Sequence, residues 1–243
     1  MTIITDQPTK PLGHKAYGSI PHLLGSRRGP SDAGVNSGQH RICTERTRDA
    51  HDQIIVSLKL DGSNVAVANV AGALVALTRA GYRAVDSPYE QHHRFAAYVA
   101  MRQMVFRSLL QPGEYMSGEW LAQAHGTRYD LTHRDPFVAF DLWQDGQRAS
   151  YADFRQRVED AGVVFAPLLH IGGPCTIATA MERADARLYG ELDMPEGAVW
   201  RVERRGVVDF LAKYVRPEKI DGCYLDSLTG QPPVWNWQGE AQP

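Results

Sequence analysis

The chain of 243 residues is 43% hydrophobic and 22% charged, a composition typical of a folded globular protein with one sizeable core. Its net charge of −2 argues against a wholly basic nucleic-acid binder, and its three scattered cysteines suggest neither a disulfide framework nor a zinc site. Residues 1–10 lack the features of a signal peptide, and the longest apolar stretch, residues 65–77, is too short to span a bilayer. We therefore expect a soluble cytoplasmic protein.

The N-terminal residues 1–50 are rich in Gly, Pro and Ser without a sustained period, which predicts an irregular segment packed in part on the core. Residues 10–50 carry seven basic against three acidic side chains, and residues 201–219 carry six against three. Such local excesses mark either a solvated face or a nucleic-acid surface. We divide the chain into this basic segment, a core over residues 51–219 and a short loop-rich tail over residues 220–243.

A strand is predicted over residues 53–58, and it ends at Lys59 before a polar turn and a second strand, Val65–Val70. A strand-end lysine beside Asp61 fits a solvated surface hairpin. It also fits a nucleophile, because an amine attacks only when neutral and so needs a site that lowers its pKa. Asp61 alone would raise that pKa, so the tuning has to come from elsewhere in the fold.

The rest of the chain alternates strands with capped helices. The predicted elements are a strand over 73–78, a helix over 89–110, strands over 115–121, 137–143 and 163–166, and helices over 150–162 and 176–186. Neighbouring His92 and His93 on the long helix face different directions, which favours surface or capping roles over metal binding. His170, Gly172 and Gly173 are expected in a loop.

Five short segments resemble the ordered motifs of the covalent nucleotidyltransferases, which comprise ATP-dependent DNA ligases, RNA ligases and mRNA capping enzymes. Lys59-Leu60-Asp61-Gly62 resembles the nucleotidyl-acceptor motif K-x-D-G. The segments that resemble the later motifs are, in order, Gly118-Glu119, Phe140-Asp141, Glu196-Gly197 and Lys213. His22-Leu23-Leu24-Gly25-Ser26 is similar to a short H-L-x-x-S segment of bacterial and phage RNA-ligase-like proteins. Together these segments resemble the ATP-dependent RNA ligase family.

The resemblance implies an α+β fold, a nucleotidyltransferase domain of the ATP-grasp-like ligase adenylation type, with antiparallel sheets forming a nucleotide cleft and helices outside. Lys59 would form lysyl-AMP from ATP, with Lys213 as the second catalytic residue, and Glu196 would hold Mg²⁺ or Mn²⁺. Phe140, rather than Phe137, would stack on the purine. The implied nucleotide-binding residues are Asp61, Gly62, Asn64, Arg79, Glu119, Phe140, Glu196 and Lys213.

The implied substrate is a pair of RNA ends, one with a 5′-phosphate and one with a 3′-hydroxyl. Arg79 and Arg216 would contact RNA or phosphate, because a guanidinium grips phosphate with two hydrogen bonds. Together with Lys213, they would help to keep Lys59 partly neutral. Only 27 residues follow Arg216, so we expect the RNA to be held by the basic N-terminal segment or by a partner protein.

The chain departs from the family pattern at its last motif. The usual K-x-K has one lysine here, and Lys213 fits either its first or its second position, with Arg216 as a possible substitute for the other. The missing lysine leaves open a non-catalytic module that binds nucleotide or RNA ends with the same fold. A DNA-ligase-like enzyme and a GTP-using, capping-type nucleotidyltransferase are the alternatives within the enzyme class.

Overall fold

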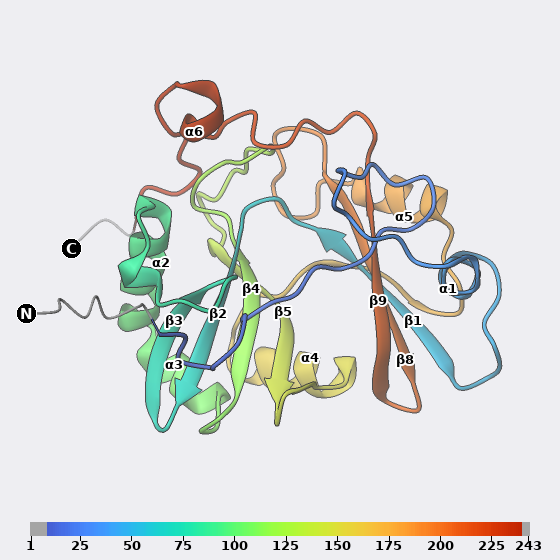
Figure 1. The fold of residues 1–243 in the computed structure, drawn as a ribbon, viewed down its shortest axis with the longest axis horizontal. Helices are drawn as coiled ribbons and strands as arrows, with labels where there is room; N and C mark the ends of the chain where they lie inside the picture. Colours follow the sequence, from blue (N-terminus) through green and yellow to red (C-terminus); the bar gives the residue numbers. More distant parts are fainter. Residues whose placement is uncertain (1–8, 240–243) are drawn as a thin grey trace, which may run out of the picture.

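The computed structural model describes residues 9–239 and builds them from two antiparallel sheets with helices outside (Figure 1). One sheet has the strand order β7-β1-β8-β9, and the other has the order β3-β2-β4-β5-β6. The predicted α+β class with antiparallel sheets is therefore confirmed. Within the described residues, no helix is long and apolar enough to cross a membrane.

The four-stranded sheet supplies one wall of a central cleft. Its strands are β1 (Asp52–Lys59), β7 (Leu168–Gly172), β8 (Gly197–Arg204) and β9 (Val207–Val215). Successive side chains of a strand point to opposite faces. In β1, Ile54, Val56 and Leu58 consequently enter one hydrophobic core, and Lys59 shares the cleft face with Ser57.

The five-stranded sheet supplies the opposite wall. Its strands are β2 (Ser63–Val70), β3 (Ala73–Thr78), β4 (Tyr115–Trp120), β5 (Phe137–Gln144) and β6 (Gln147–Arg148). Only residues 60–62 separate β1 in one sheet from β2 in the other. The K-x-D-G segment is thus the junction between the two sheets, and this places Lys59 at the base of the cleft between them.

The helices pack against the two sheets, except the last one, which lies in the C-terminal tail apart from both (Figure 1). They are α1 (Ser37–Thr44), η1 (Ala84–Asp86), α2 (Glu90–Met101), α3 (Gln103–Leu109), α4 (Tyr151–Asp160), α5 (Ile177–Ala184) and α6 (Asp226–Thr229). Ser150 and Thr176 cap α4 and α5 by accepting hydrogen bonds from backbone N–H groups of the first turn. Both helices therefore begin where their capping residues predict.

Four local predictions were wrong. The helix expected over 89–110 is two helices separated at Arg102, where neither proline nor glycine gives a sequence signal for the break. Residues 163–166 form a single bridge to β5 and no strand. The strand of this region is β7, where pairing with β1 places His170 and Gly172 in the sheet and not in the expected loop. The N-terminal segment, expected to be irregular, contains the helix α1. Residues 1–8 of this segment and residues 240–243 of the tail lie outside the described part of the chain.

A segment of the N-terminal region, residues 16–23, runs from the five-stranded sheet to the four-stranded sheet and is called the strap here (Figure 1). At one end, Tyr17 N donates to Arg79 O just after β3, over 3.2 Å. At the other end, Leu23 N donates to Lys213 O of β9, over 2.8 Å. The strap therefore connects the two sheets through main-chain hydrogen bonds.

The second hydrophobic core packs α2 and α3 against the five-stranded sheet around Phe137, which is fully buried. Its ring contacts those of Phe95, Tyr98 and Phe106. We expect Phe137→Ala to lower the free energy of unfolding by about 3–5 kcal/mol, because it leaves a cavity among packed rings. Urea denaturation measures this. Phe140→Ala, at a half-buried ring of the cleft, is the matched control; an equal loss in both variants would contradict this description of the core.

Candidate functional site

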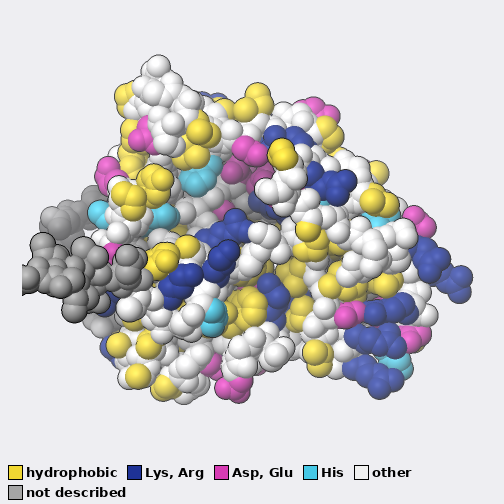
Figure 2. Space-filling model, viewed as in Figure 1, with side chains coloured by type: hydrophobic (Ala, Val, Ile, Leu, Met, Phe, Trp, Pro, Cys, Tyr) yellow, Lys and Arg dark blue, Asp and Glu magenta, His cyan; other side chains and the backbone are white. Residues whose placement is uncertain are grey.

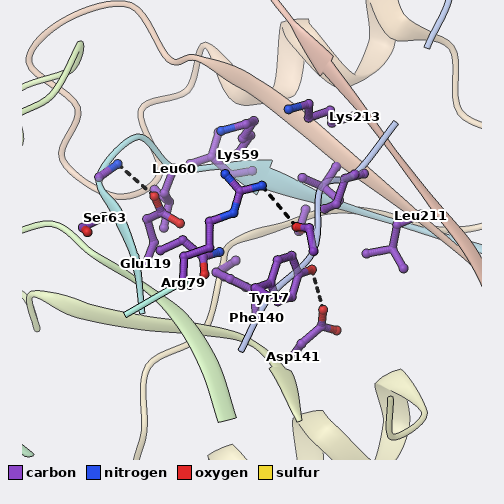
Figure 3. Close-up of a pocket in the computed structure, with 18 of the residues that line it drawn as sticks. Tyr17, Lys59, Leu60, Ser63, Arg79, Glu119, Phe140, Asp141, Leu211 and Lys213 are labelled. Atoms are coloured by element: carbon purple, nitrogen blue, oxygen red, sulfur yellow. Dashed lines mark hydrogen bonds between the residues drawn. The ribbon is translucent and has the colours of Figure 1, made fainter. Parts of the chain in front are cut away.

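The cleft between the two sheets has a volume of about 580 Å³ and is crossed by the strap. Side chains from both sheets and the strap converge in it (Figure 3). The predicted site residues that line it are Lys59, Gly62, Asn64, Arg79, Glu119, Phe140 and Lys213. Motifs that are far apart in the sequence are therefore brought together in one cavity.

Lys59, which lines the cleft, forms an ion pair with Glu196, which lies just outside the lining, with 2.5 Å between Lys59 Nζ and Glu196 Oε2. The pairing register explains the contact, because Lys59 at the end of β1 lies opposite Gly197 at the start of β8. A Cβ on Gly197 would lie 1.9 Å from Tyr214 O of β9. Only glycine allows this close approach of the strands, which fixes the position of the preceding Glu196.

The Lys59 ammonium is stabilised in the absence of nucleotide. Burial alone would lower the pKa of Lys59, but Glu196, Glu119 and Asp61 together outweigh burial and raise it above 10.5. The expectation that neighbouring cations keep Lys59 partly neutral is therefore wrong for this state of the cleft, because the acidic neighbours dominate. Lys59 has to lose its proton and leave Glu196 before it can act as a nucleophile.

Glu119 lies on the wall opposite Lys59, in β4. Its Oε1 accepts a hydrogen bond from Gly62 N over 3.0 Å, which ties it to the turn after Lys59. Burial raises the pKa of Glu119 to about 7; Lys59 opposes the shift, and Glu196 and Asp61 reinforce it. Asn64, directly across the strand pair from Glu119, has a buried Oδ1 that finds no hydrogen-bond partner among residues 9–239. Both groups offer acceptors to a ligand with hydroxyl groups.

Phe140 is half-buried in the cleft, and the ring of Tyr17 from the strap packs against it edge-on, with 5.1 Å between the ring centres. The Tyr17 hydroxyl donates to Asp141 Oδ2 over 2.6 Å, and Arg201 donates to Asp141 Oδ1 over 2.5 Å. Buried charges are tolerated when they are paired in this way. This network holds the strap and the Phe140 strand together.

Two cations of the cleft have no acidic partner. Among residues 9–239, neither Arg79 nor Lys213 forms an ion pair. Arg79 Nη2 donates to Ser19 Oγ and Gly18 O of the strap, over 3.0 and 3.3 Å. Burial, followed by the Lys59 charge, lowers the pKa of Lys213. These two side chains give the cleft positive charge that an anion can neutralise.

The position before Lys213 on the same face of β9 is Leu211, which also lines the cleft (Figure 3). Val215, the position after it, is buried outside the cleft, and its N–H donates to Ser26 Oγ. The i, i+2 spacing of K-x-K places both lysines on one strand face. This geometry matches Lys213 to the second lysine and Leu211 to the first.

Two predicted site residues point away from the cleft. Asp61 accepts hydrogen bonds from Gly126 N and Thr127 Oγ1 and forms an ion pair with Lys219. Arg216 follows the end of β9 and donates to Asp185 Oδ1 of the α5 C-terminus over 2.5 Å. The structure thus gives Asp61 and Arg216 protein partners in place of an open position in the cleft.

Sequence reasoning missed the burial of Lys219 and the position of His92 in the cleft. Lys219 is buried, although a lysine in a basic stretch is normally exposed and carries no other signal. His92 lines the cleft between Ser63 Oγ and Ser87 Oγ, at 2.9 and 2.6 Å, so it is not a surface residue. Burial lowers the pKa of His92 to about 4, with His125 and His93 adding to the shift. His22 is also buried, and its segment pairs with β9 beside Lys213.

The two basic segments of the sequence meet at the far end of the four-stranded sheet. Arg48 pairs with Asp52 and Asp209, and Arg204 pairs with Asp49 and Asp52. Figure 2 shows Lys and Arg side chains gathered there at one edge of the molecule, with others around the cleft mouth. At this end of the sheet, Arg48 and Arg204 are therefore paired within the protein, with Asp52 as the one partner from outside the two basic segments.

A divalent cation is implied by the resemblance, and Glu196 is the candidate ligand. Within residues 9–239, no group of three or more His, Cys, Asp and Glu side chains is arranged to hold a metal. Mg²⁺ usually keeps several waters and needs few protein carboxylates. The Glu196 carboxylate, whose hydrogen-bonding partner in the described chain is Lys59, fits that requirement.

The RNA ligase family model matches residues 52–215. No curated protein sequence matches the chain. The structure of Naegleria gruberi RNA ligase with PPi has a TM-score of 0.52 at 14% identity, covering 87% of this chain and 62% of that one. A mutant of that ligase with ATP and Mn has a TM-score of 0.50 at 13% identity, and the match covers 82% of this chain and 60% of that one. An archaeal ATP-dependent RNA ligase has a TM-score of 0.49 at 19% identity, and the match covers 82% of this chain and 48% of that one.

The chain thus spans 48% to 62% of the length of these ligases. The Naegleria structures share its fold. The family match covers more than half of the chain, from the start of β1 to the end of β9, and so includes Lys59, Glu119, Phe140, Glu196 and Lys213. On this match, the chain belongs to the RNA ligase family.

Proposed function

We propose that the protein is an ATP-dependent RNA ligase that forms a lysyl-AMP intermediate on Lys59. The observation that carries the proposal is the position of Lys59 at the base of a cleft, 2.5 Å from Glu196 and beside Arg79 and Lys213, which form no ion pair in the described part of the chain. A nucleophilic amine, a carboxylate and positive charge are the groups needed to transfer a nucleotidyl group from a triphosphate.

The nucleotide would lie with its base against Phe140 and its ribose hydroxyls on Glu119. An ionised carboxylate accepts two hydrogen bonds from vicinal hydroxyls. The phosphates would then lie near Lys213 and Arg79, whose charges have no acidic partner in the described chain. The neighbouring Naegleria structures contain ATP and Mn or PPi, which supports a nucleotide in this cleft.

Lys59 Nζ attacks the α-phosphorus after losing a proton, a P–N bond forms, and the bond to the β-phosphate oxygen breaks to release pyrophosphate. Lys213 and Arg79 offset the negative charge of the transition state. AMP then passes to a 5′-phosphate of RNA, and a 3′-hydroxyl displaces AMP to seal the ends. A divalent cation held by Glu196 would neutralise phosphate charge when bound.

A second candidate function rests on Leu211. An apolar side chain faces the cleft at the position that geometry assigns to the first lysine of K-x-K. A module of the same fold that binds nucleotide or RNA ends without turnover would tolerate this loss of charge. The ligase proposal requires Lys213 and Arg79 to supply enough positive charge without it.

The lysyl-AMP step is tested with α-labelled ATP and Mg²⁺, followed by denaturing electrophoresis. We expect label on the wild-type protein and none on Lys59→Ala, because no other amine occupies the nucleophile position. Lys15→Ala, at an exposed lysine, is the matched control and should retain the label. Absence of label on folded wild-type protein free of bound AMP would favour the binding module, and label from GTP alone would favour the capping-type enzyme.

The base-stacking role is tested with Phe140→Leu, which keeps an apolar side chain but removes the ring. We expect ATP to bind about 10-fold more weakly, since stacking on an aromatic ring contributes roughly 1–3 kcal/mol per base. Isothermal titration calorimetry measures the dissociation constant. Phe137→Leu is the matched control and should change stability but leave ATP affinity unaltered. The reverse pattern would assign the base-stacking role to Phe137.

The role of Glu119 gives a pH dependence. With its pKa at about 7, the carboxylate is ionised at pH 8 and largely protonated at pH 6. We expect adenosine, which lacks titrating phosphates, to bind about 10-fold more weakly at pH 6 than at pH 8. Glu119→Gln should bind weakly at both values, and a wild-type affinity independent of pH would contradict the proposed ribose contact.

The same group has an opposite effect on stability. Because folding raises the pKa of Glu119 from 4.5, the folded protein takes up this proton first as the pH falls from about 7. The free energy of unfolding should therefore rise between pH 7 and pH 5 in the wild type relative to Glu119→Gln, by at most about 3 kcal/mol. Urea denaturation of both proteins across this range measures the difference.

A further inference from the structure

Lys219 is a buried ammonium outside the cleft, with 4% of its side chain exposed. Its Nζ donates to Gly126 O over 2.5 Å and to Thr127 Oγ1, and it lies 3.2 Å from Asp61 Oδ2. A lysine has three N–H donors, and they are taken by Gly126 O, Thr127 Oγ1 and Met194 O, while Asp61 supplies the opposite charge. The group is therefore a fully satisfied internal cation and not part of the solvated surface.

The contacts of Lys219 join segments that are distant in the sequence. Asp61 belongs to the turn after the nucleophile, and Gly126 and Thr127 belong to the loop after β4. Met194 O, two residues before Glu196, lies 3.4 Å from Nζ. One ammonium thus lies where the turn that carries Lys59 meets the segment that carries Glu196.

The hydrogen bonds in this cluster have a fixed direction. Thr127 Oγ1 accepts from Lys219 and donates to Asp61 Oδ2 over 3.2 Å, and Gly126 N donates to the same oxygen over 3.1 Å. A Cβ on Gly126 would lie 2.8 Å from that oxygen and 2.5 Å from Ile220 O, so only glycine leaves room for the contact. The site is closely packed around the Lys219–Asp61 pair.

We propose that Lys219 is a positioning residue that acts through Asp61 to hold the Lys59 turn in place beside Glu196. Asp61 is the only carboxylate paired with Lys219 in the described chain, and Gly62, the next residue, donates to Glu119. Displacement of this turn would move the nucleophile and the ribose carboxylate together. The inference rests on the proposed function, because the turn is important for catalysis only if Lys59 attacks ATP.

Lys219 and Lys213 have different surroundings. Lys213 lines the cleft and is available to a phosphate. Lys219 does not line the cleft, and its donors are used by protein acceptors. A loss of Lys219 should consequently slow the attack by Lys59 and leave nucleotide affinity intact. A phosphate ligand would show the opposite pattern.

The test uses the full chain and follows single-turnover formation of lysyl-AMP across ATP concentrations, which separates the rate at saturation from the dissociation constant. The variants are Lys219→Met, Asp61→Asn and the double variant, with Lys15→Met as an exposed matched control. We expect Lys219→Met to lower the saturating rate by about 10- to 100-fold, the size of effect that small displacements of a reacting group produce. The ATP dissociation constant should change less than roughly two-fold, as a role outside the binding contacts requires.

The double variant shows whether the effect passes through Asp61. Because it contains neither charge of the pair, it should be no slower than the slower single variant, whereas independent roles would multiply the two losses. It also avoids the unpaired buried carboxylate that could prevent Lys219→Met from folding. If Lys219→Met does not fold, the double variant should match Asp61→Asn in rate.

Three results would overturn the inference: a wild-type rate in folded Lys219→Met, multiplied losses in the double variant, or weaker ATP binding with an unchanged saturating rate. Wild-type protein that forms no lysyl-AMP would instead remove the proposed function on which the inference rests. A lower thermal midpoint with an unchanged rate would assign Lys219 to stability alone.

Discussion

The buried pairing of Lys59 with Glu196 is the constraint on which the rest of the site depends. Two opposite charges in a cleft base remain there only while each compensates the desolvation of the other. The pair exists because β1 and β8 are antiparallel in a register that places the end of one beside the start of the other. It also keeps Lys59 as an ammonium, because the acidic neighbours outweigh the effect of burial on the pKa of this amine.

The local patterns of the sequence predicted much of the fold. The apolar run over residues 53–58 placed Lys59 at a strand end, and Ser150 and Thr176 marked the starts of two helices. These features depend on a few neighbouring residues, so they can be read from a single sequence. The meeting of the motifs in one cavity could be expected only from the resemblance.

Features set by distant contacts could not be predicted in the same way. The strand β7 forms because β1 offers it a partner, and Asp61 turns from the cleft because the loop after β4 surrounds it. The burial of Lys219 depends on acceptors more than 90 residues away in the sequence, at separations of 92 and 93. A basic stretch gives no sign of such an environment, since charged residues are mostly exposed.

The strap has a consequence for the order in which the molecule assembles. Ser26 Oγ, at the end of the segment that continues the strap, accepts from Val215 N across a sequence separation of 189 residues, and Tyr17 contacts Asp141 across 124. Loop closure over such distances comes late in folding, because its entropic cost is met only after local contacts have formed. During synthesis, β9 has to emerge before the strap can dock on it. A chain that stops before β9 therefore lacks the second attachment of the strap, and its cleft stays open on that side.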